Sequence, residues 1–163
     1  MLQQLITALR PAAVDGPLHV AATLKPYLSL PDLLTAEQME PDPDAYRQHI
    51  LYVEPDGSFS LVALVWLPGQ CTCIHDHVSW CVVGTYIGAE EETRYDLGAG
   101  YLLEAGMSVN RAGTVTFIEP PGDIHQVRNV SGDKVISLHV YGADVSKLGS
   151  SIRRRYELPV LVS

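Results

Sequence analysis

Cysteine and cationic residues are both scarce in this 163-residue chain. The only cysteines are Cys71, Cys73 and Cys81, which lie close together in the sequence. An odd, clustered set argues against a disulfide framework and favours a reduced, cytoplasmic setting. Lys and Arg number 11 against 19 Asp and Glu, a net charge of −8. Such an acidic protein repels phosphate backbones and anionic lipid, so we expect neither nucleic acid nor a membrane as a partner.

Long apolar runs and a secretion signal are also lacking. No apolar run approaches the roughly 20 residues of a membrane-spanning helix. The first residues, MLQQLITALRPAAV, have no basic region ahead of their apolar stretch, as a signal peptide would. We find no internal repeat, and a hydrophobic content of 47% suits one globular domain over residues 1–163.

The N-terminal 45 residues differ in pattern from the remainder of the chain. Apolar residues three to four apart predict short helices over residues 2–9 and 31–39, the second with a Pro in its first turn. The sequence PDPD at 41–44 breaks helix and marks the end of this helical segment.

Residues 46–142 are patterned as a succession of strands. Short apolar or alternating runs such as HILYV, FSLVALVWL, WCVVGTYI and KVISLHVYG are each closed by Gly, Pro, Asn or Asp. About eight strands at this spacing, without amphipathic helices between them, predict an antiparallel barrel or jelly roll. The fold class is therefore expected to be mainly all-β, with a C-terminal tail over residues 143–163.

Two histidine-bearing segments carry the strongest chemical signal. His75 and His77 alternate on a predicted strand, so they share one face and lie about 7 Å apart along it, close enough to converge on a metal. The second segment, PPGDIHQVRN, places His125 just after a tight Pro-Gly turn that starts another strand.

Together these segments resemble the two-part signature of the cupin superfamily, whose fold is a double-stranded β-helix. The one departure is Cys81, which stands where the family usually places a Glu ligand. A set of three neutral imidazoles, His75, His77 and His125, leaves positions open for a bidentate substrate and O₂. We therefore expect one mononuclear metal, Fe(II), at these three residues.

A second arrangement of the same segment must be weighed. Cys71, Cys73, His75 and His77 alternate along one strand face and superficially suggest a zinc site. Consecutive residues of a straight strand run away from each other and cannot surround one ion tetrahedrally. We expect Cys71 and Cys73 to be small buried residues lining the barrel.

A further polar set is Ser137, His139 and Tyr141, which alternate with apolar residues near the end of the barrel. They share one face of a strand. If that face points inward, the three groups can form a hydrogen-bonded chain. If it points outward, Leu138 and Val140 fill the core instead. The pattern alone does not choose between the two.

The combination of HDH, Cys81, PxGxxH and S-x-H-x-Y resembles the thiol dioxygenases, that is, cysteine dioxygenase and the bacterial 3-mercaptopropionate dioxygenases. The resemblance covers residues 46–142. It implies that the three histidines hold Fe(II) and that Ser137, His139 and Tyr141 direct the Tyr141 hydroxyl to the substrate and O₂. Cys81 resembles a cysteine that forms a thioether with the triad tyrosine in some members, so a Cys81–Tyr141 cross-link is a hypothesis.

The resemblance also implies a small carboxylated thiol as substrate. Counting from Tyr46 puts Gln48 where some members carry a carboxylate-binding Arg. Counting back from the metal motif puts His49 there, and another register would put Arg47. Bacterial members recruit a later Arg, for which the candidates are Arg153, Arg154 and Arg155, while Trp80 beside Cys81 also follows the bacterial pattern. This mixture favours a short 3-mercapto acid over cysteine.

Two other functions stay open on the sequence alone. Another metal-dependent cupin enzyme, such as a diketone-cleaving dioxygenase or an isomerase, would more often keep the Glu ligand and has no need of S-x-H-x-Y. A non-catalytic cupin that binds a small molecule would tolerate loss of the histidines. The chain is expected to be a monomer or a homodimer, since exposed strand edges can pair.

Overall fold

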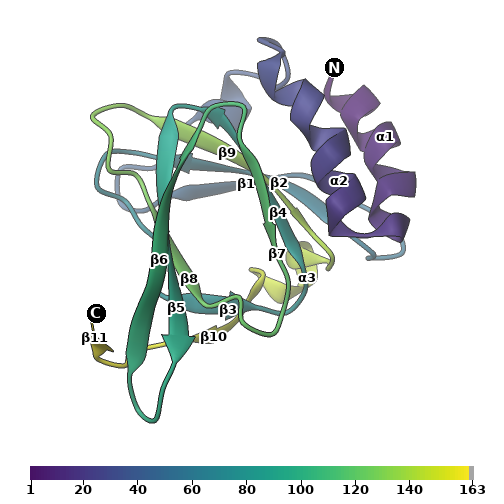
Figure 1. Ribbon diagram of the computed structural model, residues 1–163. Helices are drawn as coiled ribbons and strands as arrows, with labels where there is room; N and C mark the ends of the chain where they lie inside the picture. The colour runs from purple at the N-terminus through teal and green to yellow at the C-terminus, as the bar shows by residue number, and fades with distance from the viewer. Residues whose placement is uncertain (162–163) are drawn as a thin grey trace.

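A computed structural model describes residues 1–161 as two curved sheets that face each other (Figure 1). The first sheet has the order β1-β2-β9-β4-β7 and the second β10-β3-β8-β5-β6-β11. The strands are β1 Arg47–Val53, β2 Ser60–Trp66, β3 His75–His77, β4 Cys81–Ile87, β5 Ala89–Leu97, β6 Leu102–Arg111, β7 Val115–Ile118, β8 His125–Arg128, β9 Val135–Tyr141, β10 Ile152–Arg155 and β11 Val160–Leu161. The mainly β, barrel-like architecture expected from strand spacing is confirmed.

The N-terminal segment is more helical than its sequence suggested. Helix α1 spans Leu2–Asp15, and α2 spans Pro17–Leu24, which was not predicted. Gly16 separates them with φ 101°, a backbone conformation that favours glycine. Two short 3-10 helices come next, η1 at Lys25–Ser29 and η2 at Glu37–Met39.

The predicted helix over residues 31–39 is wrong. Thr35 and Gln38 exchange side-chain to backbone hydrogen bonds of 3.0 and 3.3 Å, a capping box that starts the helical turn only here. Glu40 is already extended ahead of Pro41, as a residue before proline prefers, so only the single turn η2 can form.

The first sheet is buried on both faces, which explains its continuous apolar runs. One face of β2 and β9 packs against helices α1 and α2, bringing Leu61 and Leu138 against Leu9 and Leu24. The other face looks into the barrel, where Trp66 packs with Tyr141 and its neighbours. Figure 1 shows both helices lying across the outside of this sheet. The polar residues of β9 must therefore point inward, between the two sheets.

Gly84 fixes how closely the helical segment approaches β4. A Cβ at this position would lie 2.9 Å from Leu24 and 3.0 Å from Leu28. Since packed carbon atoms do not approach so closely, any larger residue at Gly84 would push the helical layer away from the sheet.

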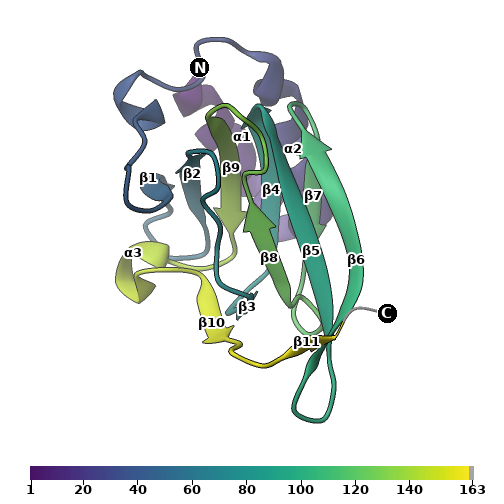
Figure 2. The ribbon, with the colours of Figure 1, turned by 90° about the vertical axis from the view of Figure 1, so that its left-hand side faces the viewer.

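The C-terminal tail contributes strands to the second sheet. After the short helix α3 at Val145–Leu148, β10 pairs with β3 and β11 pairs with β6 (Figure 2). The edge of the histidine-bearing strand β3 is thus covered by the end of the chain. Within residues 1–161 no helix has the length and apolar character to cross a membrane.

Candidate metal centre and substrate pocket

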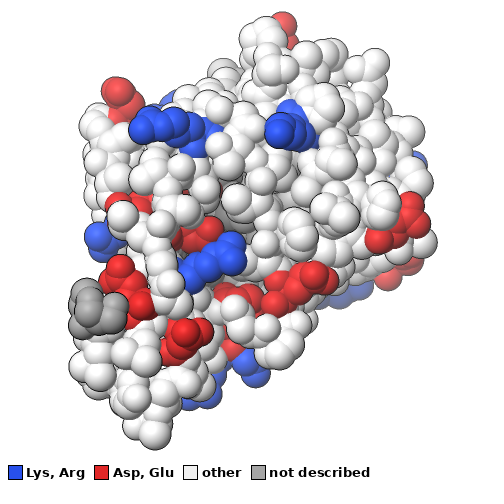
Figure 3. Space-filling model, in the orientation of Figure 1, with Lys and Arg blue, Asp and Glu red and all other residues white. Residues whose placement is uncertain are grey.

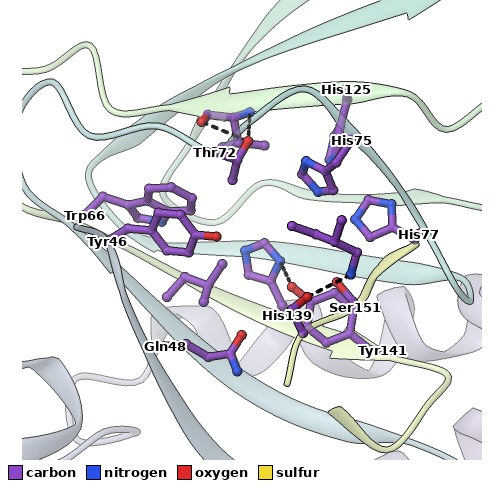
Figure 4. Close-up of a pocket in the computed structure, with 14 residues that line it drawn as sticks. Tyr46, Gln48, Trp66, Thr72, His75, His77, His125, His139, Tyr141 and Ser151 are labelled. Atoms are coloured by element: carbon purple, nitrogen blue, oxygen red, sulfur yellow. Dashed lines mark hydrogen bonds between the residues drawn. The ribbon is translucent and has the colours of Figure 1, made fainter. Parts of the chain in front are cut away.

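Three histidines converge inside the barrel. His75 and His125 are cross-strand partners on β3 and β8, and His77 lies two residues along β3 on the same face. One ligand nitrogen from each lies within 4.8 Å of the others, and all three side chains are buried. Figure 4 shows the imidazoles grouped on one side of a pocket. The structure thus brings together the three residues that the sequence singled out.

Each imidazole is oriented by an acceptor at its Nδ1 atom. His75 Nδ1 donates to the Cys73 carbonyl over 2.9 Å, and His77 Nδ1 donates to Asp123 Oδ2 over 3.0 Å. His125 Nδ1 donates to Glu92 Oε1 over 2.8 Å. With the proton on Nδ1, each ring keeps a bare Nε2, which is the form that binds a metal.

Burial keeps the rings of His75 and His77 uncharged. Burial, followed by the neighbouring His125 and His77, lowers the pKa of His75 to about 3. Burial and His125 lower the pKa of His77 to about 4. Burial raises the pKa of Glu92, but the hydrogen bonds and charges of His125 and Arg94 together outweigh it, so this pKa lies below its usual value. Neutral imidazoles backed by carboxylates are a donor set that fits a divalent transition metal.

The cysteines do not join this cluster. Among the described residues, the group able to hold a metal here contains the three histidines alone. Cys71 is exposed and Cys73 is half-buried. Both precede strand β3, so the two cysteines and the two histidines do not lie on one continuous strand. The expectation that Cys71 and Cys73 are buried residues lining the barrel is wrong.

Ser137, His139 and Tyr141 face the barrel interior and are joined by hydrogen bonds. Ser137 Oγ lies 2.9 Å from His139 Nε2, and the Tyr141 hydroxyl lies 3.0 Å from His139 Nδ1. Trp66 Nε1 donates to Ser137 Oγ over 3.2 Å at the far end. Burial, then the neighbouring histidines, lowers the pKa of His139 to about 3, so its ring is neutral and carries one N–H. The tyrosine end of this chain reaches the pocket (Figure 4).

Cys81 lies beside the same tyrosine. It is the cross-strand partner of Tyr141 on β4, and its sulfur lies 3.8 Å from His139 Nδ1. Burial raises the pKa values of both the Cys81 thiol and the Tyr141 hydroxyl well above their ordinary values. Both groups are therefore protonated at neutral pH.

The pocket in front of the histidines is lined by aromatic, apolar and neutral polar side chains. Besides the three histidines, His139 and Tyr141, its walls are Tyr46, Gln48, Leu64, Trp66, Thr72, Val127, Ser150, Ser151 and Ile152. Gln48 lies across the pocket from the imidazoles (Figure 4).

Strand β1 resolves the register that its sequence left open. Gln48 pairs with Leu64, and both line the pocket. His49 points the other way, and its Nε2 lies 2.8 Å from the Glu40 carbonyl. Arg47 is exposed, with its guanidinium 3.8 Å from the Glu40 carboxylate. Of the three candidates on this strand, only Gln48 can touch a ligand in the pocket.

The C-terminal arginines do not line the pocket. Arg153 donates to Asp76, which lies on β3 between the two histidines and also accepts a 2.8 Å bond from the Tyr156 hydroxyl. Arg154 stacks on the Tyr156 ring at 4.6 Å. Arg155 differs from both because it is the cross-strand partner of His75, and cross-strand partners project from the same face of a sheet. Its charge also acts on Tyr46 and His75.

Trp80 was expected to contact substrate, and the structure places it elsewhere. It lies in the loop before β4, next to Gly142, and packs against the helix-side core. Because Cys81 points into the barrel, the residue before it faces the opposite way.

Sequence reasoning missed the acceptors behind the histidines. Asp123 is part of the second histidine segment, and its place two residues before His125 was the available signal. Glu90 and Glu92 are buried on one face of β5, within a run of three glutamates. Ser151 and Thr72 gave no recognisable sequence signal.

The curled sheet pair and its inward-facing triad of imidazoles define this chain as a cupin with a candidate metal centre. Two solved structures share the fold. A protein from Thermus thermophilus aligns with a TM-score of 0.51 and 20% identity over 68% of this chain and 95% of its own. A cupin superfamily protein from Desulfitobacterium hafniense aligns with a TM-score of 0.50 and 10% identity over 64% and 84%.

The chain belongs to the cysteine dioxygenase type I family, whose model matches residues 2–151. Cysteine dioxygenase type 1 of Danio rerio is 34% identical over 106 residues, covering 60% of this chain and 52% of that protein. The Homo sapiens protein of the same name is 30% identical over 104 residues, with the same shares. The chain thus spans about half the length of the curated relatives it matches.

Proposed function

We propose that this protein is a non-haem Fe(II) thiol dioxygenase that converts a small carboxylated thiol and O₂ to the sulfinic acid. The observation that carries the proposal is the pairing of an all-imidazole site with the inward-facing Ser137–His139–Tyr141 chain in one pocket. Fe(II) held by His75, His77 and His125 would supply the redox chemistry that joins both oxygen atoms to sulfur.

The protein's own groups would bind and orient the reactants. Since the ligand set is neutral, a substrate thiolate brings the negative charge that a carboxylate ligand supplies in other cupins. Tyr141, held by His139, would donate a hydrogen bond to the reacting group. Trp66, Leu64 and Val127 line the pocket with apolar surface that limits water.

The direct test is O₂ uptake by Fe(II)-loaded protein with 3-mercaptopropionate, cysteine, cysteamine and mercaptosuccinate. We expect consumption of one O₂ per thiol, fastest with 3-mercaptopropionate. In Tyr141→Phe, which keeps the ring and removes the hydroxyl, kcat should fall about 100-fold. Lack of uptake with every thiol would falsify the proposal. Absence of bound metal would instead favour a binding protein, and turnover of a diketone would favour another cupin enzyme.

Arg155 is the best placed cation for the substrate carboxylate. Acidic side chains gather on the lower part of the face in Figure 3, and the net charge is −8, so an anionic substrate needs a local positive charge. Arg155 is the cross-strand partner of His75 and lies outside the pocket lining, while Gln48 offers an amide within the pocket. This assignment favours a 3-mercapto acid, whose carboxylate extends away from the sulfur.

Arg155→Ala is therefore expected to raise KM for 3-mercaptopropionate roughly tenfold, the cost of one charged hydrogen bond. The KM for cysteamine, which has no carboxylate, should stay the same. Arg154→Ala, next in the chain and stacked on Tyr156, is the matched control and should change neither value. Equal effects of the two substitutions would contradict the assignment.

A Cys81–Tyr141 thioether is a second expectation for this site, motivated by their cross-strand pairing. Its formation removes one hydrogen from each partner, with O₂ as the oxidant. Intact mass spectrometry after aerobic turnover should show the loss of two hydrogens, and Cys81→Ala should show none. Digestion that yields only unlinked Cys81 peptides would dismiss the cross-link.

A further inference from the structure

Glu90 is a buried acid that the proposed reaction does not use. It lies on β5 with 1% of its surface exposed, and its Oε2 has no hydrogen-bond partner among the described residues. The Ser137 hydroxyl, the far end of the chain that leads through His139 to Tyr141, is the hydroxyl that opposes the rise in the pKa of this carboxyl. A buried carboxyl with an unpartnered oxygen is costly to the fold, which points to a role in the neighbouring site.

The chain from Ser137 to Tyr141 can run in two directions. His139 is neutral and has one hydrogen to give, either from Nε2 toward Ser137 or from Nδ1 toward Tyr141. The Ser137 hydroxyl has one hydrogen and two acceptor sites, one of which Trp66 Nε1 occupies. Whichever partner receives the serine hydrogen therefore decides which nitrogen of His139 is protonated.

Resting on the proposed function, we propose that Glu90 is a positioning residue that sets the direction of this hydrogen-bond chain through its own protonation. Neutral Glu90 donates to Ser137, which donates to His139 Nε2. His139 Nδ1–H then donates to Tyr141, and the Tyr141 hydrogen is free to point at substrate. Ionised Glu90 accepts the serine hydrogen, so His139 donates from Nε2 and Tyr141 must donate back to Nδ1.

The two states differ by one proton, which Glu90 gives to solvent, while Ser137, His139 and Tyr141 each keep one hydrogen throughout. Only the neutral state lets Tyr141 donate into the pocket, where Ser151 also lies. In the ionised state the Tyr141 oxygen can only accept. Glu90 would thus switch the same hydroxyl between donor and acceptor from the opposite end of the chain.

The surroundings of Glu90 support titration near neutral pH. Burial raises its pKa to about 7, with Ser137 opposing and Glu92 adding to the rise. The other titratable groups that face it are Cys81 from β4 and Tyr141 from β9, both protonated at neutral pH.

Neutral groups complete this environment. Asn110, its cross-strand partner on β6, carries no charge. His139 stays neutral on the far side of Ser137. Since no Lys or Arg contributes to the Glu90 pKa among the described residues, nothing nearby holds the carboxyl ionised.

The test reads the His139 tautomer directly. In protein loaded with zinc, which is diamagnetic, nitrogen-15 NMR should show the His139 proton on Nδ1 at pH 5.5 and on Nε2 at pH 8.5. Infrared spectra should show a protonated carboxyl band lost over the same range. Glu90→Gln should abolish both changes, because it cannot ionise, while Glu91→Gln, on the opposite face of β5, should keep them.

Activity gives a second readout. The kcat of the iron-loaded protein should fall roughly tenfold between pH 6 and pH 8, following ionised Glu90, and Glu90→Gln should lose this decline. A His139 tautomer that does not change while Glu90 titrates, or that still changes in Glu90→Gln, would overturn the proposal. Failure of the dioxygenase assay alone would overturn the proposed function and leave the tautomer result standing.

Discussion

Replacing His125 with alanine is expected to remove stoichiometric metal binding and all thiol-dependent O₂ uptake. The remaining ligands, His75 and His77, both come from the three-residue strand β3, while His125 is the only one from β8. Two imidazoles from one strand cannot enclose an ion, so we expect metal affinity to fall more than about 100-fold, beyond the effect of losing an outer hydrogen bond. Metal per chain by mass spectrometry after dialysis measures this loss.

Loss of metal from His125→Ala could follow from misfolding as well as from the missing ligand, so a second variant is needed. Alanine would leave Glu92 buried without the imidazole that bonds it over 2.8 Å. His125→Asn restores a donor near Glu92 and is a poor metal ligand, so it should fold and still lack metal. His19→Ala, at an exposed position on α2, is the matched control and should bind one ion per chain. Stoichiometric metal in either His125 variant would contradict the assigned ligand set.

The second large effect concerns stability and pH. Burial raises the pKa of Glu90 from 4.5 to about 7 in the folded state. Below pH 4.5 the carboxyl is protonated in both folded and unfolded chains, so the contribution of Glu90 to the free energy of unfolding is fully present. Between pH 4.5 and about 7 the unfolded chain releases this proton while the folded chain keeps it. The free energy of unfolding therefore falls by about 3 kcal/mol over this range.

Glu90→Gln is neutral at every pH and escapes this loss. Its free energy of unfolding, relative to the original protein, should therefore rise by about 3 kcal/mol between pH 4.5 and pH 8. Urea unfolding of both proteins across this range measures the change, and any packing penalty of the amide cancels because it is the same at each pH. A difference that stays constant with pH would show that Glu90 is not protonated in the fold. Glu91→Gln should show no comparable trend.

The barrel and the three histidines could be predicted from sequence because their signals are local. Strand alternation and turn residues reveal the sheets, and His75, His77 and His125 sit in short segments with fixed spacing. The direction of Ser137, His139 and Tyr141 could not be decided, because β9 is buried on both faces and its apolar residues satisfy either orientation. Helices α1 and α2 settle it by covering Leu138 and Val140.

The proposed substrate anchor, Arg155, could not be chosen from the sequence for a different reason. Arg153, Arg154 and Arg155 are adjacent and chemically identical, and only their pairing with β3 separates them. Because of a register shift in that pairing, Arg153 donates a hydrogen bond to Asp76 and Arg155 lies opposite His75. The acceptors Glu92 and Asp123 depend likewise on contacts 33 and 46 residues apart in the chain, which no local pattern records.

The pairing of β10 with β3 bears on how the ligand strand moves. Strand β3 has three residues, and β10 covers one edge while β8 covers the other. The amide protons of this short strand can exchange with solvent only when a neighbour detaches, and β10 is an edge strand that pairs with β3 alone among the described strands, whereas β8 also pairs with β5. Deuterium uptake at His75–His77 should therefore follow uptake at Ile152–Arg155. The lifetime of a bound metal would then be governed by the fraying of a segment more than seventy residues away in the chain.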